Sequence, residues 1–159
     1  MNIFKIFDLD GSCIDSSHRQ NTRPDGTLDL DAWREKSTAE LVALDSELPL
    51  ATEFRNALRE PNVKVLILTA RVLKDPDYAW LLDHGLLANL TLSRPDGCNT
   101  PDAELKEIQL RLYADSQGIT WANFCKHSMM WDDSNSVIDR LRGIGINVFD
   151  ATYWNKAKS

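Results

Sequence analysis

Two acidic residues stand two positions apart, directly after an apolar run near the start of the chain. Residues 3–7 read Ile-Phe-Lys-Ile-Phe, and residues 8–12 read Asp-Leu-Asp-Gly-Ser. An apolar run of this length is typical of a buried strand, and a glycine lets the backbone turn sharply after it. Asp8 and Asp10 would then lie at the carboxyl end of a strand, where open α/β sheets bind ligands. Paired carboxylates in that place suit a bound cation and phosphoryl transfer, and a solvated turn after an edge strand is the alternative.

Two more strand patterns end in polar residues. Residues 63–68, Val-Lys-Val-Leu-Ile-Leu, predict a central parallel strand that is followed by Thr69 and Arg71. A later strand pattern runs into a second acidic pair, Asp132 and Asp133. Taken alone, that pair would only cap the next helix.

A lysine occupies the start of a predicted helix. Thr100-Pro101 suits a helix start, and Lys106 lies in the first turns that follow. With Glu104 and Glu107 beside it, Lys106 alone would be read as part of a solvated charged face. The order of all these residues in one sequence favours a common site.

This order resembles the four motifs of the haloacid dehalogenase-like phosphohydrolases. Within that superfamily, the sequence is most similar to the phosphatase domain of bacteriophage polynucleotide kinases and its free-standing relatives. The stretches that carry this second resemblance are residues 66–71, 93–97, 101–106 and 131–133. The resemblance covers the chain from Ile3 to about Phe149.

Each residue type suits one task in the hydrolysis of a phosphate monoester, an anion that repels nucleophiles. Asp8 is the candidate nucleophile, and Asp10 the general acid and then base. Thr69 offers a hydroxyl to a phosphoryl oxygen, and Lys106 supplies a compact positive charge. The four residues therefore form the predicted catalytic set.

A hard divalent cation, expected to be Mg²⁺, would be held through carboxylate and carbonyl oxygens of Asp8, Asp10 and Asp132. Asp133 would bind the metal directly, bind it through water, or orient its neighbour, and the sequence leaves these roles open.

Basic residues near the motifs are candidates for binding substrate. Arg71 and Arg94 are expected phosphate clamps, since a guanidinium binds phosphate in a two-pronged way. An arginine before a proline can also simply flank a turn, so Arg94 is the second choice. The resembling branch often carries a basic pair where this chain has His18 and Arg19, which reach into the site or form loop surface.

The alternation of strand and helix patterns predicts an α/β fold, a three-layer Rossmann-like parallel sheet flanked by helices with a small flap or minimal cap. The predicted strands are residues 3–8, 63–69, 88–92, 126–131 and 146–149. The predicted helices are residues 31–46, 50–60, 74–84, 101–116 and 134–142. We expect residues 1–150 to form a single domain, with the flap at about residues 11–30. Residues 151–159 are the expected C-terminal tail, frayed from Thr152 to Ser159.

Composition limits the kinds of partner that we expect the chain to bind. The chain has 159 residues, 43% of them hydrophobic, and a net charge of -6, which argue for one globular domain. The negative charge argues against strong nonspecific binding to nucleic acid or to a membrane surface. No leader or membrane-spanning pattern is present, so the expected location is the cytoplasm, or the host cytoplasm if a phage encodes the chain.

The expected partner is a phosphorylated substrate, either a nucleic-acid end or a nucleotide. A modest flap implies an open site, which favours the 3′-phosphate of a nucleic-acid end, with a mononucleotide or small metabolite as the alternative. Ser134 stands where the polynucleotide phosphatases usually have arginine, and a kinase phosphate-binding loop is absent. A phosphoacceptor signalling domain and a noncatalytic binding module rank lower, and the sequence does not predict the oligomeric state.

Overall fold

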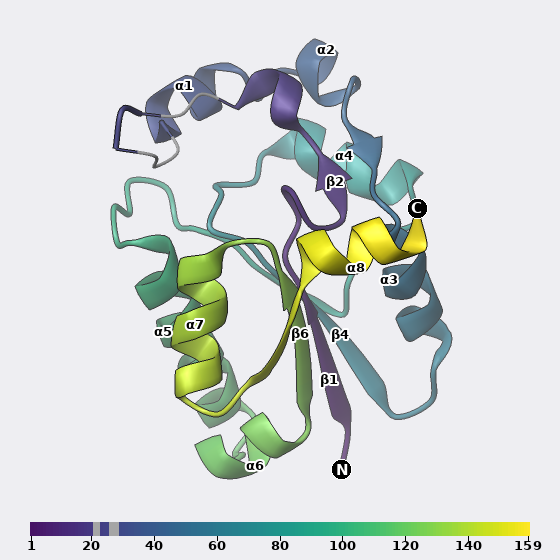
Figure 1. Cartoon of the computed structure of the whole chain (residues 1–159), viewed down its shortest axis with the longest axis vertical. Helices are drawn as coiled ribbons and strands as arrows, with labels where there is room; N and C mark the ends of the chain where they lie inside the picture. The colour runs from purple at the N-terminus through teal and green to yellow at the C-terminus, as the bar shows by residue number, and fades with distance from the viewer. Residues whose placement is uncertain (21–22, 26–28) are drawn as a thin grey trace.

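The computed structural model describes residues 1–20, 23–25 and 29–159 of the chain. Within these residues, five parallel strands form one sheet in the order β5-β4-β1-β6-β7. Figure 1 shows the central strands β4, β1 and β6 side by side. The strands are β1 (Ile3–Phe7), β4 (Val63–Leu68), β5 (Leu90–Leu92), β6 (Ser128–Asp132) and β7 (Asn147–Asp150). Each corresponds to a strand predicted from the sequence, and the predicted α/β class is confirmed.

Helices cover both faces of this sheet, and each face has its own hydrophobic cluster. One face carries α3 (Leu50–Arg59), α4 (Asp75–Asp83) and α8 (Ala151–Lys158). The other carries α5 (Asp102–Ser116), α6 (Trp121–Lys126) and α7 (Asn135–Gly143), which lie together on one side of the strands in Figure 1. The result is the predicted three-layer arrangement, with α6 as an addition that the sequence did not predict.

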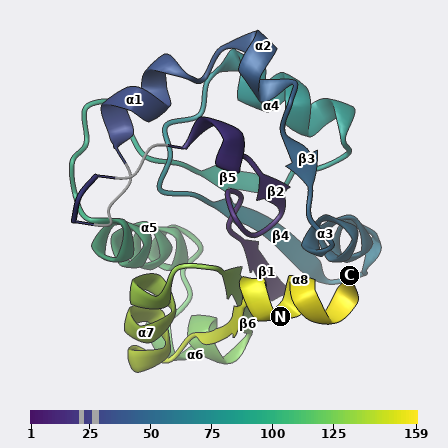
Figure 2. The same cartoon turned by 45° about the horizontal axis from the view of Figure 1, so that its top comes forward.

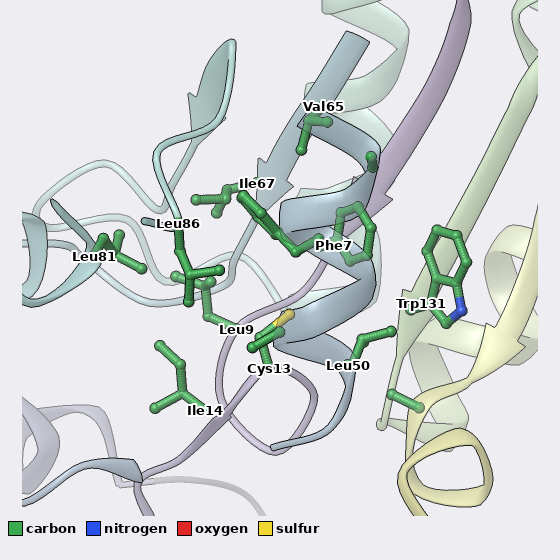
Figure 3. Packing of buried hydrophobic residues seen from close by; sticks show 14 of the residues in the cluster. Phe7, Leu9, Cys13, Ile14, Leu50, Val65, Ile67, Leu81, Leu86 and Trp131 are labelled. Carbon is green, nitrogen blue, oxygen red and sulfur yellow. The ribbon is translucent and has the colours of Figure 1, made fainter. Parts of the chain in front are cut away.

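The alternation of side chains along β1 decides toward which face of the sheet the residue after the strand points. Phe4 and Ile6 belong to the cluster under α5–α7, whereas Phe7 belongs to the opposite cluster. There the Phe7 ring lies 4.9 Å from that of Phe54 and stacks on Trp131 at 4.7 Å between ring centroids (Figure 3). Because successive strand residues face opposite sides, a residue placed after Phe7 points toward α5–α7.

A small layer of short elements lies beyond the carboxyl ends of the strands (Figures 1 and 2). It contains the antiparallel pair β2 (Ile14–Asp15) and β3 (Ser46–Glu47), the 3₁₀ turn η1 (Ser17–Arg19), α1 (Leu30–Glu35) and α2 (Ala39–Val42). We call these elements the flap layer. Residues 21–22 and 26–28 of the predicted flap lie outside the described residues.

The single helix predicted over residues 31–46 is wrong. The helix pattern is interrupted between α1 and α2, where the Thr38 hydroxyl accepts a hydrogen bond from the Leu41 main chain at 3.4 Å and starts a new helix. A threonine favours such a cap because its side-chain oxygen satisfies an N–H that has no partner within the helix.

The tail predicted to fray is the helix α8. Its Trp154 ring packs edge-on against Trp131 at 5.6 Å. The Asn155 side chain accepts a hydrogen bond from the main-chain N–H of Leu50 and donates one to the carbonyl of Ser12, both at 2.8 Å. The end of the chain therefore ties α3 to the loop after β1.

Among the residues described, no helix combines the length and apolar character that a membrane crossing needs.

Candidate active site

The central strands deliver two carboxylates to the same side of the sheet. Asp8 follows β1 on the side of Phe4 and Ile6, and Asp132 ends β6 on the side of Met130. Trp131, between Met130 and Asp132, lies in the opposite cluster (Figure 3). Both carboxylates therefore point toward α5, the helix that carries the predicted lysine.

Lys106 joins these two carboxylates. Its Nζ lies 3.0 Å from Asp8 Oδ1 and 2.6 Å from Asp132 Oδ2, and all three side chains are buried. Burial by itself would lower the pKa of Lys106, but Asp132 and Asp8 raise it above its usual range. Lys106 is thus a permanent ammonium beside the candidate nucleophile.

Ser12 and Asp133 complete the surroundings of Asp8. The Ser12 hydroxyl lies 2.8 Å from Asp8 Oδ2 and 3.4 Å from Asp133 Oδ1. The Ser134 main-chain N–H donates to Asp132 Oδ1 at 2.9 Å, which fixes the orientation of that carboxylate. No role was predicted for Ser12 from the sequence, and its place inside the first motif is the only signal that pointed to it.

The acidic residues form a group that suits a metal ion. Within the described chain, one carboxylate oxygen each of Asp8, Asp132 and Asp133 lies within 4.8 Å of the others. Burial and the charge of Asp8 raise the pKa of Asp132 to about 6 and that of Asp133 to about 9. An all-oxygen, like-charged set of this kind fits a hard divalent cation such as Mg²⁺, which would relieve the repulsion.

Among the described residues, the carboxylate of Asp10 is not part of this acidic group. Arg71 binds it side-on, with Nε 2.8 Å from Oδ2 and Nη2 3.1 Å from Oδ1, and the Ser16 hydroxyl donates to Oδ1 at 2.8 Å. The predicted contact of Asp10 with the cation therefore stays a prediction.

Thr69 stands at the end of β4, the neighbour of β1 in the sheet. Its side chain is buried, and its hydroxyl oxygen accepts the main-chain N–H of Arg71 at 3.2 Å. A hydroxyl that accepts one hydrogen bond still has its own hydrogen to donate. Thr69 therefore keeps the donor that the predicted contact with a phosphoryl oxygen requires.

Arg94 is held inside the protein. It donates to the carbonyls of Ala70, Cys98 and Thr100 at 2.6, 2.9 and 2.8 Å, and to Asp102 Oδ1 at 2.8 Å. These bonds shape the loop that leads into α5 and so position the helix that carries the lysine. In this arrangement Arg94 binds protein oxygens, and its predicted contact with a phosphate stays a prediction.

The pair His18-Arg19 also points to a protein carboxylate. Arg19 donates from Nε and Nη2 to Asp45 at 2.9 and 2.7 Å, and His18 Nε2 lies 2.8 Å from Asp45 Oδ1. The Arg19 side chain has no exposed surface. Of the four basic residues predicted to bind substrate, three, Arg71, Arg94 and Arg19, have guanidinium groups bound to protein oxygens.

Comparison with known proteins fits this geometry. The sequence matches the family described as bacteriophage T5 5′-deoxynucleotidase over residues 1–159. The chain belongs to this family. A curated 5′-deoxynucleotidase of Escherichia phage T5 is 37% identical over 84 residues, which are 51% of this chain and 34% of that protein. The match thus spans about a third of the length of the curated relative.

Solved structures share the fold. A structure of the Pnkp1/Rnl/Hen1 complex superposes with a TM-score of 0.67 at 20% identity, covering 94% of this chain and 46% of the other. A haloacid dehalogenase-like hydrolase from Streptococcus pneumoniae gives a TM-score of 0.66 at 11% identity, covering 94% of this chain and 84% of the other. A hydrolase of the haloacid dehalogenase superfamily from Geobacter sulfurreducens gives a TM-score of 0.62 at 15% identity, covering 94% of this chain and 89% of the other.

The chain therefore shares the fold of haloacid dehalogenase-like hydrolases. The superfamily resemblance inferred from the four motifs is confirmed.

Proposed function

We propose that this chain is a Mg²⁺-dependent phosphomonoesterase that forms an aspartyl-phosphate on Asp8, and that its substrates are 5′-deoxynucleoside monophosphates. The observation that carries the proposal is the position of Lys106 between Asp8 and Asp132, with Asp133 completing the acidic group. Such a site combines a buried nucleophile with a fixed positive charge, as the attack of one anion on another requires.

The reaction has two balanced steps. A carboxylate oxygen of Asp8 forms a bond to phosphorus, the bond from phosphorus to the leaving oxygen breaks, and Asp10 gives that oxygen a proton. Asp10 then takes a proton from a water molecule that attacks the same phosphorus, and the bond to Asp8 breaks. Inorganic phosphate leaves, and both aspartates return to their starting states.

The other residues stabilise charge. Lys106 and the Thr69 hydroxyl would face the phosphoryl oxygens, on which negative charge develops in the transition state. Ser12 would orient Asp8 through its hydrogen bond to Oδ2. A Mg²⁺ ion held by Asp8, Asp132 and Asp133 would supply Lewis-acid neutralisation of the phosphoryl group.

The substrate ranking differs from that drawn from the sequence. The sequence favoured the 3′-phosphate of a nucleic-acid end, with mononucleotides second. The family match supports a nucleotide, and the net charge of -6 gives a long polynucleotide little electrostatic attraction. We therefore place 5′-deoxynucleoside monophosphates first and 3′-phosphorylated ends second.

The chemistry is tested with Asp8→Asn. We expect phosphatase activity to fall by about a thousandfold or more, because an amide is a poor nucleophile. Asp139→Asn, a change on the exposed surface of α7, is the matched control and should leave activity unchanged. Full activity of Asp8→Asn, or wild-type turnover in the presence of a chelator, would contradict the mechanism.

The substrate is tested with a panel at saturating Mg²⁺. The panel compares 5′-deoxynucleotides, 5′-ribonucleotides, 3′-nucleotides and 3′-phosphorylated oligonucleotides by kcat/KM. If 3′-phosphorylated oligonucleotides exceed the 5′-deoxynucleotides by tenfold, about 1.4 kcal/mol in transition-state stabilisation, the substrate ranking is wrong.

A further inference from the structure

A line of alternating charges runs from the general acid into the flap layer. Arg71 spans the first link: Nε and Nη2 bind Asp10, and Nη1 contacts Asp77 Oδ1. Asp77 is itself fixed, because its Oδ2 accepts the main-chain N–H of Lys74 at 2.9 Å at the start of α4. The atoms that hold Asp10 are thus held in turn by a helix that the proposed reaction does not use.

The line continues beyond Asp77. Arg19 Nη2 lies 3.7 Å from Asp77 Oδ1 and 2.7 Å from Asp45 Oδ2. His18 meets Asp45 from the outer side at 2.8 Å. The sequence of groups is therefore carboxylate, guanidinium, carboxylate, guanidinium, carboxylate and imidazole. We call these six residues the charge chain.

Because most of the charge chain is buried, its members depend on one another for charge compensation. Its four middle side chains, Arg71, Asp77, Arg19 and Asp45, are at most 3% exposed, whereas Asp10 at one end is 17% and His18 at the other 31% exposed. A charge withdrawn from water is stable only while it keeps an opposite partner, and removal of one member takes one partner from each of its neighbours. Burial alone would lower the pKa of Arg71, and Asp10 with Asp77 raises it above its usual range.

The charge chain joins segments that are distant in the sequence. Arg71 follows β4, Asp77 lies in the first turn of α4, Arg19 ends η1, and Asp45 precedes β3. A carboxylate that gives a proton to a leaving group must be held within hydrogen-bonding reach of it. Side-on binding by a guanidinium fixes both the position and the rotation of a carboxylate.

We propose that Asp77 and Arg19 are positioning residues for the proton transfer by Asp10: they hold Arg71, and Arg71 holds the carboxylate in its working orientation. On this view Arg71 serves Asp10 and is not a phosphate clamp. The inference rests on the proposed function, because it assigns a support to the general acid and base of that mechanism.

The test varies the leaving group. An aryl phosphate with a nitrophenolate leaving group needs little protonation, whereas a 5′-deoxynucleotide leaves as an alkoxide and depends on the acid. For Asp77→Asn we expect single-turnover cleavage of the 5′-deoxynucleotide to slow by about tenfold or more. The rate of the pre-steady-state burst of nitrophenolate from the aryl phosphate should change by less than about threefold. Asp75→Asn, an exposed change in the same helical turn, should alter neither rate.

A second measurement separates positioning from loss of folding. In an Asp10→Asn background the acid is already absent, so adding Asp77→Asn should not slow 5′-deoxynucleotide cleavage further. Arg19→Lys, which keeps the charge but loses the forked geometry, should show the same selective loss as Asp77→Asn.

The outcomes are distinct. Equal losses for both leaving groups, or additive losses in the Asp10→Asn background, would overturn the positioning role while leaving the proposed function intact. A wild-type chain without phosphatase activity would overturn the proposed function and this inference with it.

Discussion

At the residue scale, the tightest constraint in the site falls on Gly11. Its φ of +79° lies in the left-handed region, and a Cβ built there would lie 2.2 Å from Asp133 Oδ2. The absence of a side chain therefore does two things: it permits the turn after β1, and it lets Asp133 approach the loop that carries Asp8 and Asp10.

Gly11→Ala tests this constraint, and Gly97→Ala is its control. Gly97 has the same φ of +79°, but a Cβ there meets nothing within 4 Å. Both variants should lose about 1–3 kcal/mol of unfolding free energy from backbone strain. Only Gly11→Ala should also weaken Mg²⁺ binding, measured by calorimetry, because it displaces Asp133. Equal Mg²⁺ affinity in the two variants would show that Gly11 matters only for the turn.

Some site residues follow from the sequence and others do not. Asp8, Lys106 and Asp132 were predicted because strand ends and a helix start, taken in order, bring their residue types together. Asp77 reads only as an acid in a first helical turn, a common pattern that favours the helix N-terminus. Its contacts with Arg71 and Arg19 depend on how the flap layer and α4 meet, which no local pattern encodes.

The arginines illustrate the same limit of prediction from sequence, because the residue type does not identify its partner. A guanidinium near a strand end matches phosphate, protein carboxylates and carbonyl groups equally well in residue type. The sequence therefore indicated Arg71 and Arg94 as phosphate clamps, whereas the structure pairs their donors with Asp10, Asp77 and loop carbonyls.

At the element scale, the last helix is part of the support of the site. The sequence of α8 carries Lys156 and Lys158 in its last turn and looked like a frayed end. Its order comes from tertiary contacts: Trp154 enters the aromatic group around Trp131, and Asn155 bridges α3 and the carbonyl of Ser12. Short helices gain most of their stability from such packing and little from propensity.

Asn155→Ala tests the contribution of this bridge. The main-chain N–H of Leu50 and the carbonyl of Ser12 would lose buried partners, so we expect a loss of about 1–3 kcal/mol in unfolding free energy. Asn123→Ala, an exposed change on α6, should cost less than about 0.5 kcal/mol. Urea denaturation of the two variants provides the comparison. Similar midpoints would mean that α8 adds little to the stability of the fold.

At the scale of the whole molecule, an acidic chain of net charge -6 gathers buried carboxylates at one end of its sheet. The folded-state pKa values of Asp132, about 6, and Asp133, about 9, exceed the usual value of 3.8. A raised carboxyl pKa means that the folded state binds the proton more tightly than the unfolded state does. Without a cation, the contribution of these groups to the unfolding free energy is therefore present at low pH and is lost as the pH rises through these pKa values.

Magnesium should reverse this loss, because it replaces the departing protons and binds the folded state. We expect the rise in melting temperature on adding Mg²⁺ to be larger at about pH 8 than at about pH 5.5, where protons compete for Asp132 and Asp133. Thermal unfolding with and without Mg²⁺ at both pH values measures the effect. Asp139→Asn should keep the wild-type pH dependence, and Asp133→Asn should flatten it. A Mg²⁺ effect of equal size at the two pH values would mean that these carboxylates do not hold the ion.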